Sequence, residues 1–317
     1  MTRTALKSAS MALKLLSIAV TWRCNLRCTI CSIWKQAPSP PEFLDLDRIK
    51  QALGHPFFDG LEYLNWFGGE PTLFPRLAEA IAWARGRFPR AHERAVVTNA
   101  WQARPVLERL AGADPDLLVC LSLDGFAPVH DARHGQTGSY DEVLRGILFV
   151  RDHFRKRPRL SVTVAPGGAE ALLDVAAVAE YYDCEVALRP AVRGSYFRGE
   201  SDVSWTPAQV ANLDTVLNRL PDRAKGNLDF TAAIGRFLRT GAHRPCACKG
   251  LTGVVDPDGK FRLCHSHELA LPIGEVPARW DGLVLDALKS ECFKPECFID
   301  GPYALSYLAP EHAPWLK

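Results

Sequence analysis

The chain has 317 residues, of which 47% are hydrophobic and 23% charged, so it can bury a full core and is not a disordered protein. Its 38 basic and 36 acidic residues give a net charge of +2, which argues against a broad cationic surface for nucleic acid. Ten cysteines are too few for a small disulfide scaffold, where cysteine exceeds about 8–10% of the residues.

The N-terminal segment, residues 1–14, places Arg3 and Lys7 ahead of the apolar run Leu15–Val20. This run is shorter than the 18 or more apolar residues of a membrane span. It also continues directly into Thr21-Trp22-Arg23-Cys24, without the layout of a signal peptide. We therefore expect a cytoplasmic protein with neither a membrane nor a nucleic acid as partner.

Short apolar runs alternate with segments of helical period over the first 190 residues. The expected strands are Leu15–Val20, Leu61–Phe67, Ala95–Thr98, Leu117–Leu123, Leu160–Ala165 and Glu185–Leu188. Their Val, Leu and Ile content is typical of parallel strands buried on both faces. The expected helices are Leu46–Leu53, Arg76–Arg87, Pro105–Ala111, Tyr140–Arg155 (with Ser139 as its N-cap) and Ala169–Tyr182.

Six strand–helix units over residues 15–190 predict an α/β fold, a partial (β/α)6 TIM-like barrel, because a closed TIM barrel needs eight units. Residues 191–245 are expected to form a helical connection, with helices at Pro207–Leu220 and Leu228–Thr240. Residues 246–317 are expected to form a small α+β extension. It contains a β-hairpin of Thr252–Val255 and Lys260–Leu263 around the turn Asp256-Pro257-Asp258-Gly259, and then a short helix, Leu283–Ser290.

The first motif is C-x3-C-x2-C, formed by Cys24, Cys28 and Cys31 directly after the first expected strand. Three thiolates converging from one loop suit a soft metal, either zinc or an iron–sulfur cluster. A structural zinc site needs four ligands, and the nearest histidine is the distant His55. Three ligands with one open position are what catalysis at a metal requires.

The second motif, Gly68-Gly69-Glu70-Pro71, ends the second expected strand. The glycine pair lets the backbone come close to a ligand, and Pro71 fixes the turn. Glu70 offers an acceptor for an ammonium group. Taken alone, this motif is equally compatible with a purely structural turn.

Together, the two motifs resemble the radical S-adenosylmethionine (SAM) superfamily, over about Leu15–Arg189. The resemblance implies that Cys24, Cys28 and Cys31 hold a [4Fe-4S] cluster whose fourth iron chelates SAM. It implies that Gly68–Pro71 bind the methionine amine. It also implies reductive cleavage of SAM to methionine and a 5′-deoxyadenosyl radical that abstracts a substrate hydrogen, with a flavodoxin or ferredoxin as electron donor.

Two further pairs lie at the carboxyl ends of expected strands. Ser122 and Asp124 look like the family's Ser-x-Asp, which contacts SAM, and Thr98-Asn99 lie on the same rim, where β/α enzymes bind ligands. A capping or turn role is the alternative for each pair. The stretch His130–Gly135, followed by Gly138–Asp141, looks like a segment of SPASM-type members, with Arg133 either near SAM or substrate or in a solvated loop.

Five cysteines lie near the C-terminus: Cys246, Cys248, Cys264, Cys292 and Cys297. The pattern Cys248-x10-Gly259-x4-Cys264 resembles the family's SPASM/twitch pattern, and Cys292 and Cys297 would complete a four-thiolate site. Cys246 has a permitted spacing too, so either it or Cys248 is the ligand. The further cysteines of a full SPASM domain are missing, which favours the twitch form with one auxiliary [4Fe-4S] cluster. A zinc site is the alternative.

The remaining candidates receive no catalytic role. Cys120 and Cys184 are expected to be inert core thiols, and His265 and His267 to lie on the hairpin surface. A loop after the sixth strand could hold an anionic group or be ordinary solvated chain; its residues are Arg189, Arg193, Tyr196 and Arg198.

The sequence thus favours a radical SAM enzyme whose auxiliary cluster assists oxidation or rearrangement. The expected substrate is a small metabolite such as a sugar alcohol or a nucleotide, and the alternative is a maturase of a ribosomal peptide or protein. The short segment before Leu15 argues against a separate leader-peptide-binding domain. A non-catalytic zinc or electron-transfer protein would have no need for Gly68–Pro71.

Overall fold

A single nine-stranded sheet organises the part of the chain that the computed structural model describes, residues 13–35, 41–191, 205–221, 251–264 and 269–289. The strand order is β6-β5-β4-β3-β2-β1-β7-β8-β9, parallel from β6 to β7 and antiparallel at β8 and β9. The strands are β1 Leu15–Ala19, β2 Tyr63–Phe67, β3 Glu93–Thr98, β4 Leu118–Ser122, β5 Arg159–Val164, β6 Glu185–Pro190, β7 Thr252–Val255, β8 Lys260–Arg262 and β9 Leu271–Pro272.

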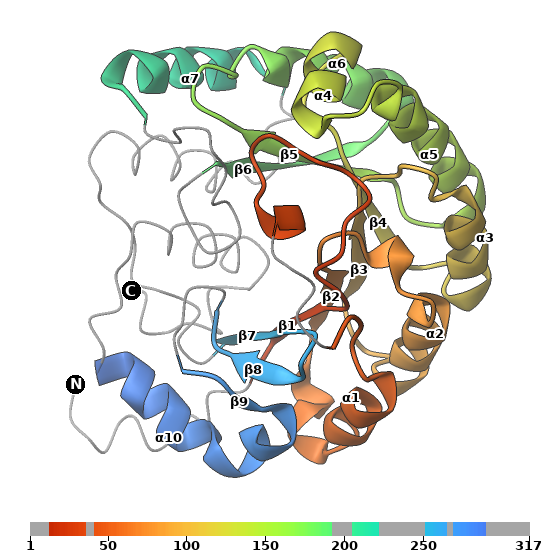
Figure 1. The fold of residues 1–317 in the computed structure, drawn as a ribbon, viewed down its shortest axis with the longest axis vertical. Helices are drawn as coiled ribbons and strands as arrows, with labels where there is room; N and C mark the ends of the chain where they lie inside the picture. The colour runs from red at the N-terminus through yellow and green to blue at the C-terminus, as the bar shows by residue number, and fades with distance from the viewer. Residues whose placement is uncertain (1–12, 36–40, 192–204, 222–250, 265–268, 290–317) are drawn as a thin grey trace.

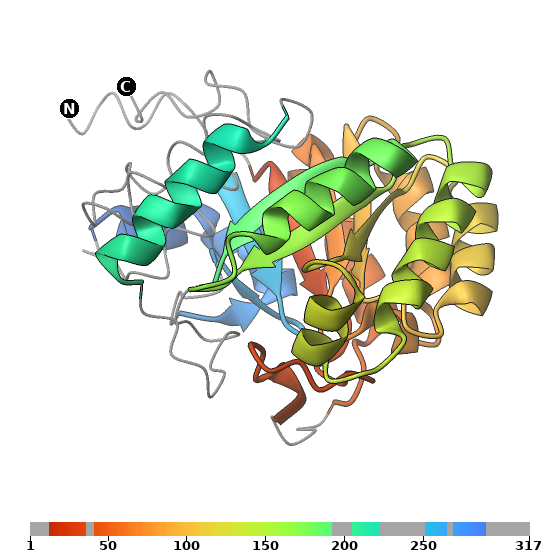
Figure 2. The same cartoon turned by 90° about the horizontal axis from the view of Figure 1, so that it is seen from above.

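Helices cover the outer, convex face of the curved sheet, so that it forms an open barrel wall (Figures 1 and 2). They are α1 Leu46–Leu53, α2 Leu77–Arg87, α3 Arg104–Ala113, α4 Ala127–His134, α5 Ser139–His153, α6 Ala171–Tyr182, α7 Pro207–Arg219 and α10 Val276–Lys289. Short 3-10 helices are η2 Ile33–Lys35, η3 Pro56–Gly60, η4 Pro71–Leu73 and η6 Ile273–Glu275. The predicted partial barrel, with its six parallel strands, is confirmed. Among the described helices, none has the length and apolar character needed to cross a membrane.

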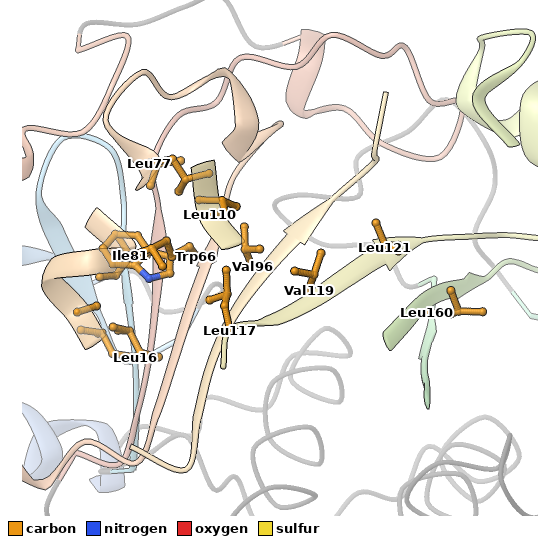
Figure 3. Packing of buried hydrophobic residues seen from close by; sticks show 14 of the residues in the cluster. Leu16, Trp66, Leu77, Ile81, Val96, Leu110, Leu117, Val119, Leu121 and Leu160 are labelled. Atoms are coloured by element: carbon orange, nitrogen blue, oxygen red, sulfur yellow. The ribbon is translucent and has the colours of Figure 1, made fainter. Parts of the chain in front are cut away.

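The core lies between the sheet and its outer helices. Leu16, Trp66, Val96 and Leu121, from four neighbouring strands, belong to one buried cluster with helix residues such as Ile81 of α2 and Leu110 of α3 (Figure 3). Fully burying such a side chain contributes about 1.5–3 kcal/mol.

The inner face of the sheet is less apolar than the sequence predicts. Ser17, Asn65 and Ala95 occupy one register row across β1, β2 and β3, and β2 and β5 alternate between buried and half-buried residues. The prediction of strands buried on both faces is therefore wrong for β2 and β5.

A solvated loop is one of the two interpretations that the sequence allows for residues 130–135. It is wrong, because helix α4 covers most of these residues. His130 and His134 lie one turn apart and are both buried, so α4 packs against the barrel. The N-cap of α5 is also not the predicted Ser139. Gly138 occupies that position, and the α4 carboxylate of Asp131 accepts hydrogen bonds from the Gly138 and Tyr140 amides at 2.7 and 2.8 Å.

The C-terminal hairpin extends the barrel sheet, because β7 pairs in parallel with β1, Leu15 opposite Thr252. The predicted hairpin is confirmed, with Gly259 at a φ of +77° in its turn. Helix α7 confirms the first predicted helix of the connection, and α10 begins at Val276 rather than Leu283. The predicted helix Leu228–Thr240 lies outside the described residues, and the domain boundaries stay predictions.

Candidate functional site

The loop after β1 carries three cysteines at the carboxyl end of the sheet. Cys24, Cys28 and Cys31 are all half-buried thiols. Burial raises the pKa of Cys24 to about 11, and burial also raises the pKa values of Cys28 and Cys31. Cys24 and Cys31, on the same loop, further raise the pKa of Cys28.

The cysteine loop supplies hydrogen-bond donors as well as thiols. The Leu26 amide donates to the Cys24 Sγ at 3.5 Å, and the Asn99 Nδ2 donates to the same sulfur at 3.9 Å. Donors to sulfur stabilise the thiolate that binds iron and tune the cluster. The loop therefore fits an iron–sulfur cluster held by three thiolates. Within the described ranges, no group of three or more His, Cys, Asp or Glu side chains is close enough to hold a single metal ion.

The Gly68-Gly69 pair brings the turn after β2 against the start of the cysteine loop. The Gly69 amide donates to the Thr21 carbonyl, and the Glu70 amide to the Arg23 carbonyl, both at 2.8 Å. A Cβ on Gly68 would lie 2.2 Å from the Thr21 oxygen, and one on Gly69 would lie 2.2 Å from the Arg23 oxygen. The two glycines thus allow a close approach to the backbone of Thr21 and Arg23. Binding of SAM by this turn stays a prediction.

Glu70 is only 1% exposed, and donors of the protein itself surround its carboxylate. It caps η4, accepting from the Thr72 amide at 3.0 Å, and it also accepts from the Thr98 hydroxyl at 2.8 Å and the Asn99 amide at 2.9 Å. Burial raises the pKa of Glu70, and these hydrogen bonds oppose the rise only in part. Glu70 therefore joins the turn after β2 to the turn after β3.

Asn99 extends this network to the cysteine loop. Its Nδ2 donates to the Asn25 Oδ1 at 2.9 Å, in addition to its contact with Cys24. The sequence indicates Thr98 and Asn99 only as rim residues, and the structure connects both to Glu70. The two sequence motifs and the β3 turn thus form one continuous hydrogen-bonded unit.

Asp124, two residues beyond the half-buried Ser122, is buried at the end of β4. Its Oδ1 accepts from the Thr163 amide at 2.8 Å, and its Oδ2 lies 3.3 Å from the His134 Nε2. Burial acts to raise the pKa of Asp124, but His134, the Arg133 guanidinium and the Thr163 amide outweigh it, so the pKa lies below its ordinary value. Contact of Asp124 with SAM stays a prediction.

Helix α4 adds two buried imidazoles. The rings of His130 and His134 stack with centroids 3.9 Å apart, and the Asp124 amide donates to the His130 Nδ1 at 3.2 Å. Burial, followed by the influence of His134, lowers the pKa of His130 to about 3, so this ring is neutral at pH 7. The sequence signal for this pair was the i, i+4 spacing, which places both rings on one helix face.

Of the predicted C-terminal ligands, the structure describes Cys264, which is buried just after β8. Cys246, Cys248, Cys292 and Cys297 lie outside the described residues, as do His265, His267, Arg193, Tyr196 and Arg198. Cys120 and Cys184 are buried, as expected for core thiols, and burial raises the pKa of Cys184 to about 12.

The fold and the three-thiol loop agree with the family to which the sequence is matched. Residues 18–171 match the sequence model of the Radical SAM superfamily, and the chain belongs to this superfamily. Its members use a [4Fe-4S] cluster and SAM. The predicted superfamily is thereby confirmed.

Particular relatives differ in what they act on. The chain is 28% identical over 264 residues to the mycofactocin maturase MftC of Mycobacterium tuberculosis H37Rv, covering 79% of this chain and 65% of that protein. It thus spans about two thirds of that relative's length. It is 26% identical over 295 residues to GTP 3′,8-cyclase 1 of Pseudomonas aeruginosa, covering 86% and 87% of the two chains.

Among solved structures, Streptococcus suis SuiB bound to SAM superposes with a TM-score of 0.70 over 95% of this chain and 74% of its own, at 12% identity. SuiB bound to its precursor peptide SuiA gives 0.68 over 93% of this chain and 72% of its own, also at 12% identity. At this identity the likeness concerns the fold alone.

Proposed function

We propose that this protein is a radical SAM enzyme that modifies a peptide, with Cys24, Cys28 and Cys31 as the ligands of its SAM-cleaving cluster. The hydrogen-bonded unit that joins Cys24 to Asn99 and Glu70 carries the proposal, because it ties both family motifs into one site. When bound, the cluster and SAM supply an electron and a 5′-deoxyadenosyl radical that removes a hydrogen atom from the substrate.

The chain's own groups hold and shape this site. The Leu26 amide and Asn99 amide group donate to the Cys24 sulfur and so favour its thiolate. We assign the residues predicted to bind SAM, Gly68–Pro71, Thr98, Asn99, Ser122 and Asp124, to the walls of the SAM site. Among these, the carboxylates of Glu70 and Asp124 act through internal hydrogen bonds that fix the turns around them.

The peptide substrate rests on the relatives. One is a mycofactocin maturase, another is a bacteriocin biosynthesis protein of Bacillus subtilis, and the SuiB fold has been solved with a precursor peptide. This favours the maturase, which the sequence had placed second to a small metabolite. A nucleotide is the second candidate, because the GTP 3′,8-cyclase match covers 87% of that relative. A one-electron donor such as a flavodoxin or ferredoxin belongs to either proposal.

Formation of 5′-deoxyadenosine from SAM tests the enzyme class. Reconstituted anaerobic protein given dithionite and SAM should release it, whereas Cys24→Ala, Cys28→Ala and Cys31→Ala should each abolish release. Cys184→Ala is the matched control, because this buried thiol lies outside the cysteine loop. Cleavage that survives in Cys28→Ala would show that the cluster is held elsewhere.

Deuterium transfer distinguishes the two substrate classes. Candidate peptides encoded near the gene, deuterated at Cα and Cβ, should pass deuterium into 5′-deoxyadenosine, and deuterated GTP should not. Transfer from GTP alone would replace the peptide proposal by the nucleotide one.

The auxiliary cluster is also part of the proposal, with Cys264 as one ligand and the other C-terminal cysteines as its partners. Iron content should be about eight per chain with two clusters and about four with one. Cys264→Ala should keep SAM cleavage and lose product formation. A Cys264→Ala protein that retains all its iron and forms product would remove the auxiliary cluster from the mechanism.

A further inference from the structure

The cysteine loop contacts the last turn of α4 through its backbone. The Thr29 amide, one residue beyond Cys28, donates to the Arg133 carbonyl at 2.8 Å. Gly135 ends α4 at a φ of +65°, and a Cβ there would lie 2.8 Å from the Arg27 carbonyl oxygen. The position of the loop between two cysteines therefore depends on where α4 ends.

The last turn of α4 is in turn fixed by Asp124. The Asp124 Oδ2 lies 3.3 Å from the His134 Nε2 and 3.8 Å from an Arg133 guanidinium nitrogen, while its Oδ1 accepts from the Thr163 amide. Arg133 also donates to the Thr163 carbonyl at 2.9 Å. Two adjacent α4 residues are thus bound to the ends of β4 and β5.

Packing alone does not account for the imidazoles. The His130 Nε2 and His134 Nδ1 are buried and have no hydrogen-bond partner among the described residues. Buried polar atoms without partners oppose folding, so an aromatic ring without nitrogen atoms would fill the same space with less loss. What the histidines add is their contact with Asp124, His134 at the carboxylate and His130 at the amide.

We propose that His134 is a positioning residue, which acts through Asp124 and the last turn of α4 to hold the cysteine loop in the conformation that binds the cluster. His130 supports it by stacking on the His134 ring and accepting the Asp124 amide. That the loop binds a cluster and SAM rests on the proposed function. The contacts that connect His134 to the loop lie within the chain and do not depend on it.

Two substitutions separate the hydrogen bond from the packing. His134→Phe keeps a ring to stack on His130 but removes the donor to Asp124, whereas His134→Gln restores an N–H near the Nε2 position. His153→Phe is the matched control, because His153 also stacks on a ring, that of Phe149 at 4.0 Å, but lies at the far end of α5. Hydrogen–deuterium exchange of the peptide spanning residues 24–31 is measured on the whole chain, before and after iron–sulfur reconstitution.

We expect exchange of this peptide, which contains the Thr29 amide, to be about tenfold faster in His134→Phe, close to wild type in His134→Gln, and unchanged in His153→Phe. Reconstituted His134→Phe should also show a shifted electron paramagnetic resonance signal of the reduced cluster. Equal exchange in the wild type and His134→Phe would overturn the proposal, as would a His134→Gln variant no better than His134→Phe. Failure to cleave SAM would count against the proposed function alone, because the exchange of the iron-free chain does not depend on it.

Discussion

Glu70 and Asp124 are buried carboxylates at the carboxyl ends of β2 and β4, and their pKa values shift in opposite directions. Burial dominates at Glu70, whose partners are neutral hydroxyl and amide donors, so its pKa is raised. At Asp124 burial also acts to raise the pKa, but the hydrogen bond with His134 and the Arg133 guanidinium outweigh it, so the pKa is lowered. The hydrogen bond from His134 and the nearby Arg133 charge are what Asp124 has and Glu70 lacks, and they decide the sign of the shift.

This contrast gives a pH prediction for Asp124→Asn. A lowered pKa means that ionised Asp124 stabilises the fold above its unfolded pKa of about 3.9, and that this contribution is lost as the pH falls through the lower folded value. Asp124→Asn should therefore cost about 1–3 kcal/mol in the free energy of unfolding near pH 7, and less below about pH 4. Urea unfolding at several pH values measures the difference.

The control for that experiment is Glu108→Gln, an exposed residue paired with Arg104 on α3. It should change the free energy of unfolding by about 0.5 kcal/mol or less. A deficit of Asp124→Asn that stays constant down to pH 2 would contradict the assigned pKa direction.

At the scale of elements, the sequence predicts those whose pattern is local and misses those that depend on distant partners. The five barrel helices with regular apolar periods were predicted to within a few residues. Helix α4 was missed because His130, Asp131 and His134 read as polar loop residues, while in the fold they bind Asp124 and the start of α5. Likewise, the sequence assigns the close approach at Gly68-Gly69 to a ligand, whereas the structure places the Thr21 and Arg23 carbonyls there, which are remote in sequence.

The α5 N-terminus provides the first element-scale prediction. Asp131 caps this helix from α4, accepting from two backbone amides and the Ser139 hydroxyl. Asp131→Ala should cost about 1 kcal/mol, the usual loss for a removed N-cap acceptor. Asp152→Ala, in the last turn of the same helix, should be neutral or slightly stabilising, because an acidic group there opposes the helix dipole. Thermal unfolding measures the stability of both variants. Equal midpoint temperatures for Asp131→Ala and Asp152→Ala would show that Asp131 does not cap α5.

The turn at Gly68-Gly69 provides the second prediction at the scale of elements. Gly69→Ala would place a Cβ 2.2 Å from the Arg23 carbonyl oxygen, so the cysteine loop has to move. We expect lower iron incorporation on reconstitution and a loss of stability of about 1–3 kcal/mol. Gly86→Ala is the control, because nothing lies within 4 Å of a Cβ at that position in α2, and it should stabilise the helix by up to about 1 kcal/mol. Normal iron content in Gly69→Ala would contradict a role of this contact in forming the site.

At the scale of the whole molecule, the sequence predicts the barrel but not its continuation. Each parallel pair from β6 to β1 follows from consecutive strand–helix units. The pairing of β7 with β1 joins Thr252 to Leu15 across most of the chain, and no local pattern encodes it. The hairpin was predicted from its turn, whereas its membership of the barrel sheet comes from burial of the β1 edge.

Phe261 of β8 is the largest of the hairpin side chains that pack into the core, together with Val255 and Leu263. It is fully buried, covers Gly253 of β7 so closely that a Cβ there would lie 2.1 Å from its ring, and contacts Trp280 of α10, which in turn contacts Phe57. Phe261→Ala should therefore cost about 3–5 kcal/mol. If the hairpin and barrel share one core, urea unfolding followed by tryptophan fluorescence and circular dichroism should remain a single transition with a lower midpoint. Leu148→Ala, at an exposed site on α5, should leave the midpoint nearly unchanged. Two separate transitions in Phe261→Ala, with the barrel midpoint unaltered, would show that the hairpin unfolds independently and that the β1–β7 pairing adds little to the barrel.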